Sequence, residues 1–166
     1  MICPVCQWQN YVGEDICENC GADLRATDIP EPATSFQGKL LGAHLDELGA
    51  PEPETIDADA PVGDAIMRMR REGLDCLLVT HDGALVGIFT DRDAVLKVAG
   101  RATDRRPVRE LMTPDPVVLR RDDPIAVAIN KMAVGGFRHV PIVDAGRPMA
   151  VVSAKDVFRH ISARLG

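Results

Sequence analysis

The chain has 166 residues, which suffice for one domain with a small appendage or for two compact repeats. Hydrophobic residues make up 46% of the sequence and aromatic residues only 4%, so we expect an aliphatic core and few aromatic stacking surfaces. No segment approaches the roughly 20 continuous apolar residues of a membrane helix, and no secretory signal pattern precedes Cys3. We therefore expect a cytoplasmic protein that does not enter the membrane.

The net charge of −6 is distributed unevenly along the chain. Residues 1–60 contain 2 Lys/Arg and 12 Asp/Glu, whereas residues 61–166 contain 17 and 13. The first 24 residues contain no Lys or Arg at all. Because nucleic-acid affinity comes mainly from basic side chains that neutralise phosphates, this composition argues against DNA or RNA binding by the N-terminal segment.

Four of the five cysteines form two pairs near the N-terminus, Cys3 with Cys6 and Cys17 with Cys20. A two-residue gap lets both thiolates of a pair face one point, and two such pairs supply the tetrahedral sulfur set that Zn²⁺ favours. Four protein thiolates leave no open position for water or substrate. We therefore expect residues 1–24 to form a structural zinc site without catalysis.

The cysteine segment resembles the short zinc ribbons at the front of many bacterial proteins, which open with Cys-Pro-x-Cys and close with Cys-x-x-Cys-Gly. Gly21 fits this pattern because the residue after such a turn often needs a positive φ. A rubredoxin-like iron site stays an alternative, although those proteins have a longer loop between the pairs and a glycine after both, where this chain has Gln7. Disulfides are disfavoured because nothing marks the chain as secreted and Cys76 lies far from the pairs.

Beyond its cysteines, the N-terminal part of the chain offers little chemistry. We expect Trp8, Tyr11 and Ile16 to pack over the metal loop rather than to bind a ligand. Residues 25–42 are rich in Pro, Ala, Thr, Ser and Gly and lack hydrophobic periodicity, which is typical of a flexible linker. We place a domain boundary there, followed by a short helix that begins between Leu40 and Leu45.

The remainder of the chain is internally duplicated: residues 45–97 match residues 108–160 at a constant offset of 63 without a gap. The matches fall at turn formers, helix starts and core positions together. The paired residues include Pro51 and Pro114, Pro61 and Pro124, Met69 and Met132, Gly73 and Gly136, Gly83 and Gly146, and Asp93 and Asp156. We therefore expect two copies of one folding unit, over residues 43–100 and 106–163.

The first half of each copy predicts a strand and a helix. A short extended segment, 54–56 or 117–119, precedes a proline at a helix start, Pro61 or Pro124, and Asp123 is a candidate cap in the second copy. Isoleucine and methionine then recur at helical spacing, which indicates a buried helix face rather than a methionine cofactor site.

The second half of each copy predicts a hairpin and a final helix. Two apolar strands flank Asp82-Gly83 in the first copy and Asp144-Ala145-Gly146 in the second, which is the turn chemistry of a β-hairpin. The final helix begins near Arg92 or Lys155. The order β-α-β-β-α in each copy predicts an α/β (α+β) fold of tandem repeats behind a small zinc ribbon.

Three stretches of this duplicated part resemble the cystathionine β-synthase (CBS) domain, which occurs as tandem pairs. They are residues 111–114 (LMTP), 137–144 (FRHVPIVD) and 87–93 (GIFTDRD). The resemblance covers about residues 45–163 and implies two copies packed sheet to sheet, two candidate clefts between them, and frequent homodimers. It also implies AMP, ADP, ATP or S-adenosylmethionine as ligands, and a regulatory role.

Thr90 and Asp93 in the first copy match Ser153 and Asp156 in the second, each pair where a strand ends and a helix begins. A hydroxyl followed three residues later by a carboxylate is close to a capping box, which alone stabilises a helix by about 1 kcal/mol. The same geometry leaves helix amides suited to phosphate, and a carboxylate that can accept hydrogen bonds from ribose hydroxyls. Capping and binding are compatible, and the resemblance implies that the hydroxyls contact phosphate and the carboxylates ribose.

The resemblance also implies basic groups beside the ligand. Arg138 and His139 stand where family members often present phosphate contacts. Arg92 and Lys155 lie inside the hydroxyl-to-carboxylate spacing and could add positive charge, although each also fits an exposed helix position. Apolar walls for adenine have three candidates, Ile56, Val118 and Val140.

The two copies are not equivalent in these positions. Where the second copy has Arg138 and His139, the first has Asp75 and Cys76, and we expect Cys76 to be a buried small apolar residue rather than a nucleophile. Ala150 replaces the glycine of the first copy, Gly87, which makes a close approach of the backbone to a ligand less favourable in the second copy.

The sequence contains no catalytic triad, paired-carboxylate site or P-loop pattern. We expect a non-enzymatic regulatory protein that binds an adenine nucleotide or related adenosyl ligand between its repeats, forms a homodimer, and uses the zinc ribbon structurally or to contact a partner protein. Two alternatives stay open: a zinc-ribbon factor associated with nucleic acid, and a redox or electron carrier. Salt-sensitive binding of DNA or RNA would identify the first, and the colour of an iron-loaded protein the second.

Overall fold

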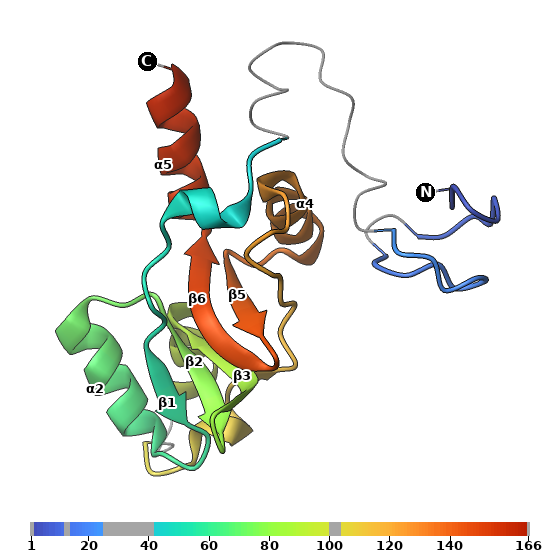
Figure 1. The fold of residues 1–166 in the computed structure, drawn as a ribbon. Coiled ribbons are helices and arrows are strands. Elements are labelled where there is room, and N and C mark those ends of the chain that lie inside the picture. The colour runs from blue at the N-terminus through green and yellow to red at the C-terminus, as the bar shows by residue number, and fades with distance from the viewer. Residues whose placement is uncertain (1, 12–13, 25–41, 100–103, 166) are drawn as a thin grey trace. The chain divides into compact units, whose positions relative to one another are not determined.

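The computed structural model describes residues 2–11, 14–24, 42–99 and 104–165 (Figure 1). The linker expected at residues 25–42 therefore lies almost entirely outside the described residues. The chain forms two compact units, and neither is continuous in sequence. One comprises Met1–Gly49, Arg120–Val140 and Val152–Gly166, and the other comprises Ala50–Leu119 and Pro141–Val151.

The first copy contains the elements expected from the sequence. They are β1 (Thr55–Asp57), α2 (Val62–Glu72), β2 (Cys76–His81), β3 (Ala84–Thr90), α3 (Asp91–Asp93) and the π-helical turn η2 (Ala94–Val98). β1 pairs in parallel with β2, and β2 pairs antiparallel with β3, so α2 is the crossover between two parallel strands. Asp82 and Gly83 have φ angles of 50° and 78°, which fits the type I′ hairpin turn that Asp-Gly favours.

The core of the first copy lies between α2 and one face of this sheet (Figure 1). Leu77 and Val79 of β2 belong to the same buried cluster as Met69 of α2. The alternate residues of β2, Cys76 and Leu78, form a second cluster with Ile88 of β3. β2 is therefore buried on both faces, as its continuous apolar sequence predicts.

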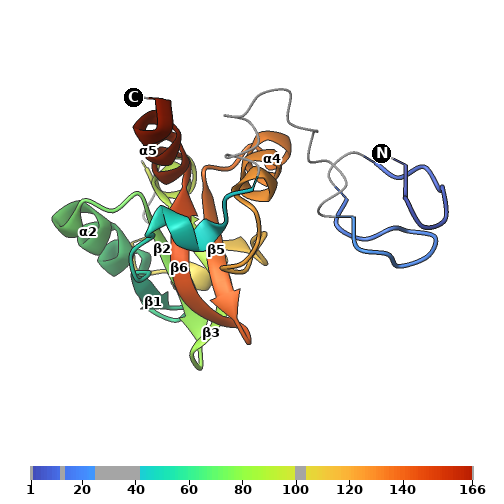
Figure 2. The same cartoon turned by 45° about the horizontal axis from the view of Figure 1, so that its top comes forward.

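The second copy repeats this order with a shorter first strand. Its elements are η3 (Val108–Glu110), β4 (Thr113–Pro114), α4 (Ile125–Gly135), β5 (His139–Asp144), β6 (Arg147–Ser153) and α5 (Ala154–Leu165). β5 and β6 form a two-stranded sheet (Figure 2). The strand expected at residues 117–119 is reduced to one parallel bridge between Leu119 and Ile142, which repeats at an offset of 63 the pairing of Ile56 with Val79.

The turns and helix starts of the second copy follow the sequence with one correction. Ala145 and Gly146 have φ angles of 47° and 79°, so this hairpin turn matches that of the first copy. Pro124, and not Asp123, is the N-cap of α4. The Asp123 carboxylate instead accepts a hydrogen bond of 2.8 Å from the backbone N–H of Arg120, which shapes the turn before the helix.

A short arm precedes each copy and packs on the start of the other copy's first helix. Ahead of the first copy, the carbonyl of Ala43 accepts a hydrogen bond from the N–H of Ile125 at 2.9 Å. Ahead of the second copy, the carbonyl of Arg106 accepts one from the N–H of Val62 at 2.8 Å. Each arm ends in a short 3₁₀ helix, η1 (Leu45–Leu48) or η3, whose first residue is buried.

The sheet of the first copy also receives a strand from the start of the second. β4 pairs antiparallel with β3, with Pro114 opposite Gly87 and Thr113 opposite Ile88. The four-stranded sheet therefore has the order β1-β2-β3-β4. No helix among the described residues is long and apolar enough to cross a membrane.

Candidate functional site

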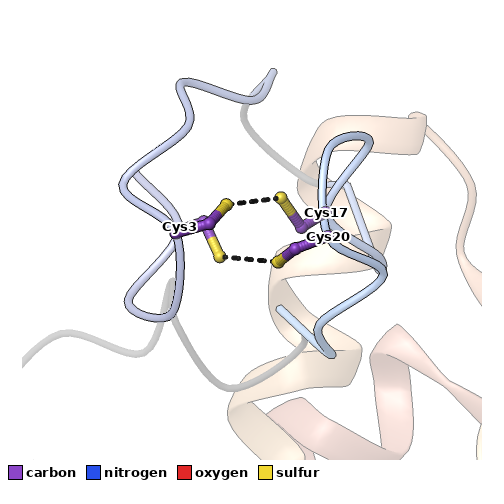
Figure 3. A group of neighbouring side chains, drawn as sticks. Cys3, Cys17 and Cys20 are labelled. Carbon is purple, nitrogen blue, oxygen red and sulfur yellow. Dashed lines mark hydrogen bonds between the residues drawn. The ribbon is translucent and has the colours of Figure 1, made fainter.

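The four N-terminal cysteines converge on one point (Figure 3). Their sulfur atoms all lie within 4.8 Å of one another, with Cys3 and Cys20 at 3.7 Å and Cys6 and Cys17 at 3.5 Å. In a tetrahedral site with Zn–S bonds of about 2.3 Å, neighbouring sulfurs lie about 3.8 Å apart. The donor set and its spacing therefore fit a closed four-thiolate zinc site, and no ligand position is left for water or substrate.

The two cysteine turns have the same backbone shape. The N–H of Gln7 donates to the carbonyl of Cys3, and the N–H of Gly21 donates to the carbonyl of Cys17, both at 2.9 Å. Gln7 and Gly21 have φ angles of 59° and 72°. A non-glycine residue therefore adopts the left-handed conformation after the first turn, so the missing glycine does not by itself separate this site from an iron site.

Asn10 is a structural residue of the cysteine segment (residues 2–24) that the sequence analysis did not identify. It is 4% exposed, and its amide nitrogen donates to the carbonyl of Trp8 at 3.1 Å and toward the sulfur of Cys17 at 3.6 Å. Its amide oxygen accepts from the N–H of Glu18 at 3.0 Å. One buried side chain thus ties the loop between the cysteine pairs to the second pair.

The thiols influence one another strongly. Burial raises the pKa of Cys17, but the N–H groups of Cys20 and Asn19, the Cys6 thiol and the Asn10 amide together lower it to about 6. The N–H of Ala22 lowers the pKa of Cys20, but Cys6, burial, Cys17 and Cys3 together raise it to about 12. Without a cation the four groups therefore cannot all be thiolates at neutral pH, and metal binding must release protons.

The expectation that Trp8, Tyr11 and Ile16 pack over the metal loop is wrong. Their exposed fractions are 51%, 76% and 60%. The buried cluster consists instead of Cys3, Cys17 and Leu24, with Leu24 fully buried. A segment of this size closes around its four cysteines and has no interior left for three large side chains.

The two helix starts have the same hydrogen bonds. In the first copy, the carboxylate of Asp93 accepts from the backbone N–H and the hydroxyl of Thr90 at 3.0 and 2.7 Å. In the second copy, Asp156 accepts from the N–H and hydroxyl of Ser153 at 2.8 and 2.6 Å. Both pairs are therefore complete capping boxes, and each uses only the Oδ2 atom of its aspartate.

The other oxygen of each aspartate has different partners in the two copies. In the first copy, Asp93 Oδ1 contacts Lys97 Nζ at 2.7 Å and accepts from the Thr113 hydroxyl at 3.4 Å. In the second, Asp156 Oδ1 contacts Arg159 at 3.3 Å, and the Arg159 side chain is 74% exposed. Asp93 is also the more buried carboxylate, with 9% of its side chain exposed against 13% for Asp156.

The remaining candidates divide between the two units. Arg138 is exposed and His139 is half-buried at the start of β5, and the carbonyl of Arg138 accepts from the first N–H of α5 at 2.9 Å. Arg92 and Lys155 are exposed. Val118 is 41% exposed. Arg138, His139, Ser153, Lys155 and Asp156 belong to one unit, and Thr90, Arg92, Asp93 and Val118 to the other.

Cys76 and Gly87 have structural explanations in the first copy. Burial, followed by the charges of Asp75 and Asp91, raises the pKa of the Cys76 thiol to about 12, so this cysteine is an inert apolar residue. A Cβ atom at Gly87 would overlap the thioether of Met112. The glycine therefore accommodates Met112, a side chain of the protein itself.

Both copies match the family model described as the CBS domain, over residues 45–100 and 108–163. The two matches together cover more than half of the chain. The protein therefore belongs to the CBS-domain family and carries its domain as a tandem pair, with a cluster of four cysteines near the N-terminus.

Two curated relatives from Arabidopsis thaliana are CBS-domain-containing proteins. CBSCBSPB3 is 36% identical over 127 residues, which are 74% of this chain and 23% of the relative. CBSCBSPB5 is 33% identical over 114 residues, which are 67% of this chain and 21% of the relative. The chain thus spans about a fifth of the length of these relatives.

Solved structures of CBS proteins share the fold. ATU1752 from Agrobacterium tumefaciens is 29% identical with a TM-score of 0.66, covering 71% of this chain and 98% of that one. CBSX2, solved in complex with AMP, is 24% identical with a TM-score of 0.66, covering 75% of this chain and 100% of that one. The CBS pair of MJ0100, solved with 5′-methylthioadenosine and S-adenosyl-L-methionine, is 22% identical with a TM-score of 0.61, covering 71% and 98%.

Proposed function

We propose that the CBS pair binds an adenine nucleotide or a related adenosyl ligand, and that the protein is a non-enzymatic regulatory module. The observation that carries this proposal is the matched helix start, a hydroxyl and a carboxylate in one hydrogen-bonded unit in both copies. The AMP complex of CBSX2 and the S-adenosyl-L-methionine complex of MJ0100 support the ligand class.

The second copy offers several groups for such a ligand. The 12-residue helix α5 begins at Ala154, directly after β6, and the positive end of its dipole favours phosphate there. Asp156 retains an oxygen whose protein partner, Arg159, is on the surface. The exposed Arg138 precedes β5 and adds positive charge for phosphate oxygens.

Titration calorimetry with adenosine, AMP, ADP, ATP and S-adenosylmethionine tests this assignment. Asp156→Ala should weaken nucleotide binding by roughly 1.5–3 kcal/mol, because a charged acceptor of ribose hydroxyls is lost. Arg138→Ala should weaken ATP more than adenosine. Asp144→Ala, an exposed carboxylate in the hairpin turn of the same copy, is the matched control. If the parent protein binds no member of the panel, the helix starts are caps only and the proposal is wrong.

We further propose that the four cysteines hold one structural zinc ion in a reducing, cytoplasmic setting. The sulfur spacing and the shared thiol protons support this, because a dication is what lets all four groups ionise together. Metal analysis should find about one zinc per chain, and iron would give a coloured protein instead. Cys17→Ser should abolish tight metal binding, whereas Cys76→Ser should leave the metal content unchanged.

Chelation of the zinc tests whether the metal stabilises only the cysteine segment or the whole protein. The binding energy of structural zinc, about 10 kcal/mol in comparable peptides, should hold the cysteine segment folded. Removing the metal should therefore expose amides of residues 2–24 to hydrogen exchange while the CBS pair stays protected. Simultaneous loss of protection in both parts would show that the metal stabilises the whole protein.

Exposed apolar side chains support two kinds of protein contact. The cysteine segment exposes Ile2, Val5, Trp8, Tyr11 and Ile16 and has no basic residue, which suits a partner protein with an apolar surface and a basic rim.

In the CBS pair, Val95 and its equivalent Phe158 are 66% and 70% exposed, which supports a homodimer. Light scattering should give a dimer for the parent and a monomer for Val95→Glu combined with Phe158→Glu.

A further inference from the structure

The helix-start aspartates of the two copies are held differently, although their capping boxes are the same. We propose that the ion pair between Lys97 and Asp93 excludes a ligand from the helix start of the first copy. Asp93 is then a structural anchor, and the protein binds one ligand, whose ribose contacts Asp156. This inference rests on the proposed nucleotide binding and extends it, because it assigns the ligand to one copy and names the residue that excludes it from the other.

Asp93 has no acceptor position left for a ligand hydroxyl. A carboxylate offers about four acceptor positions. The N–H and hydroxyl of Thr90 fill two of them at Oδ2, and Lys97 and the Thr113 hydroxyl fill two at Oδ1. The ammonium contact is charge-assisted, so a neutral ribose hydroxyl binds Asp93 Oδ1 less strongly than Lys97 does.

Lys97 makes hydrogen bonds in addition to its ion pair with Asp93. Its ammonium group donates to the carbonyls of Leu111 and Met112 at 2.8 and 3.2 Å in addition to its contact with Asp93 at 2.7 Å. These contacts fix the ammonium group beside Asp93 and the backbone of residues 111 and 112. Lys97 lies in η2, a π-helical turn closed by the N–H of Ala99 and the carbonyl of Ala94, and such turns occur often at functional positions.

The segment that carries these carbonyls also covers the neighbouring strand. Met112 occupies the space that a side chain at Gly87 would need, and Thr113 and Pro114 pair with β3 as the strand β4. Asp93, Lys97 and Met112 therefore form one continuous contact across the end of the first copy. A nucleotide could bind there only after this contact had opened.

The second copy lacks the closing side chains at the equivalent sequence positions. The constant offset of 63 places His160 at the position of Lys97, Gly49 at that of Met112 and Ala50 at that of Thr113. Glycine and alanine supply neither a thioether nor a hydroxyl. The imidazole of His160 contacts Arg164 through Nδ1 at 2.9 Å, and among the described residues its buried Nε2 has no hydrogen-bond partner.

Asp156 consequently keeps an acceptor position for a ligand hydroxyl. Its partners among the described residues are the two Ser153 donors and Arg159, and Arg159 has a largely exposed side chain. Surface ion pairs exchange readily with water and contribute little, so ribose hydroxyls can take this oxygen. The replacement of lysine by histidine four residues after the aspartate is the change that distinguishes a ligand acceptor from an anchor.

Calorimetric stoichiometry with AMP tests the assignment in the zinc-loaded, 166-residue chain. The parent should bind one AMP per chain. Lys97→Gln removes the ammonium group and should add a second, weaker binding event, giving two per chain. Arg71→Gln, which removes an exposed cation of α2 from the same copy, should leave the stoichiometry at one. Two AMP per parent chain, or one per Lys97→Gln chain, would overturn the inference.

A reciprocal variant keeps the inference testable if Lys97→Gln does not fold. His160→Lys transfers the closing residue to the second copy and should weaken AMP binding at least tenfold, whereas the control His160→Gln should retain it. Unchanged affinity in His160→Lys would contradict the closing role. A parent protein that binds no AMP or other adenosyl ligand would instead reject the proposed function itself, so the two failures are distinguishable.

Discussion

The first and second copies of the CBS domain have the same elements and the same capping boxes, yet they use the same aspartate for different purposes. In the first copy, Asp93 joins a helix start to Lys97 and to the segment that opens the next copy. In the second copy, the contacts of Asp156 with other described residues are those with its cap, Ser153, and with the exposed Arg159. A motif that is repeated in both copies therefore does not by itself identify a binding site. The residue four positions later and residues of a distant segment determine whether the carboxylate can accept a ligand.

The largest difference expected between the copies is in stability. Asp93→Asn should cost about 2–3 kcal/mol, below the roughly 3–5 kcal/mol of a fully buried ion pair because Lys97 is 37% exposed. Asp156→Asn should cost only about 1 kcal/mol, as for the loss of a cap. Urea unfolding of the zinc-loaded protein measures both losses, and Asp144→Asn is the surface control. Equal losses at the two positions would remove the distinction between anchor and acceptor.

A smaller effect is expected where Gly87 faces Met112. Gly87→Ala should destabilise the protein by about 1–2 kcal/mol, because the new methyl group overlaps the Met112 thioether. The same substitution in a Met112→Ala background should cost much less. A double-mutant cycle by thermal unfolding measures this coupling. If the cost of Gly87→Ala does not depend on residue 112, Met112 is not what requires a glycine there.

The smallest expected effect is a pH dependence of stability that comes from His160 in the second copy. Burial of His160 lowers its pKa below the ordinary value of 6.5; the charge of Arg164 adds to this, and Glu47 opposes it. The unfolded chain therefore binds a proton at this residue more readily than the folded chain, so stability should fall as the pH drops below about 6.5. Protonation would also place a donor at Nδ1, where the Arg164 guanidinium already donates.

Comparison of the parent with His160→Gln isolates this contribution. The unfolding free energy of the parent should decline more steeply than that of the variant between about pH 7 and pH 5. The equivalent residue of the first copy is Lys97, so the first copy has no imidazole at this position. Parallel pH profiles for the two proteins would show that His160 is protonated equally well in the folded and unfolded states.

Local sequence rules predicted much of this fold. The constant offset of 63, the hairpin turns at Asp82-Gly83 and Ala145-Gly146, and the cysteine cluster all depend on residues that are close in sequence or repeat at fixed spacing. These features express backbone preferences and ligand spacing, which neighbouring residues determine. The family assignment followed from the same local patterns.

The unpredicted features depend on residues that are distant in sequence. Lys97 reaches carbonyls 14 and 15 residues away, and Met112 fills the space beside Gly87. A lysine in a helix or a glycine in a strand does not by itself indicate either of these contacts. The role of Asn10 was also not predicted, although its partners are near in sequence. An asparagine in a loop is ordinarily a turn residue, and only its burial shows that it joins two loops.

The exchanged arms have a consequence for the history of the chain. The 3₁₀ helix that begins each copy completes the other: Val108 lies in the core of the first, and the N–H of Leu45 donates to the carbonyl of Asp123 in the second at 3.0 Å. In a chain with one copy alone, the arm would have no second copy to pack on, and the core would lack the arm that the second copy supplies. Such a chain could complete both parts by exchanging arms with a second molecule. In the duplicated chain the exchange is intramolecular, so it does not depend on protein concentration. Each copy can then acquire its own substitutions, as Lys97 and His160 show.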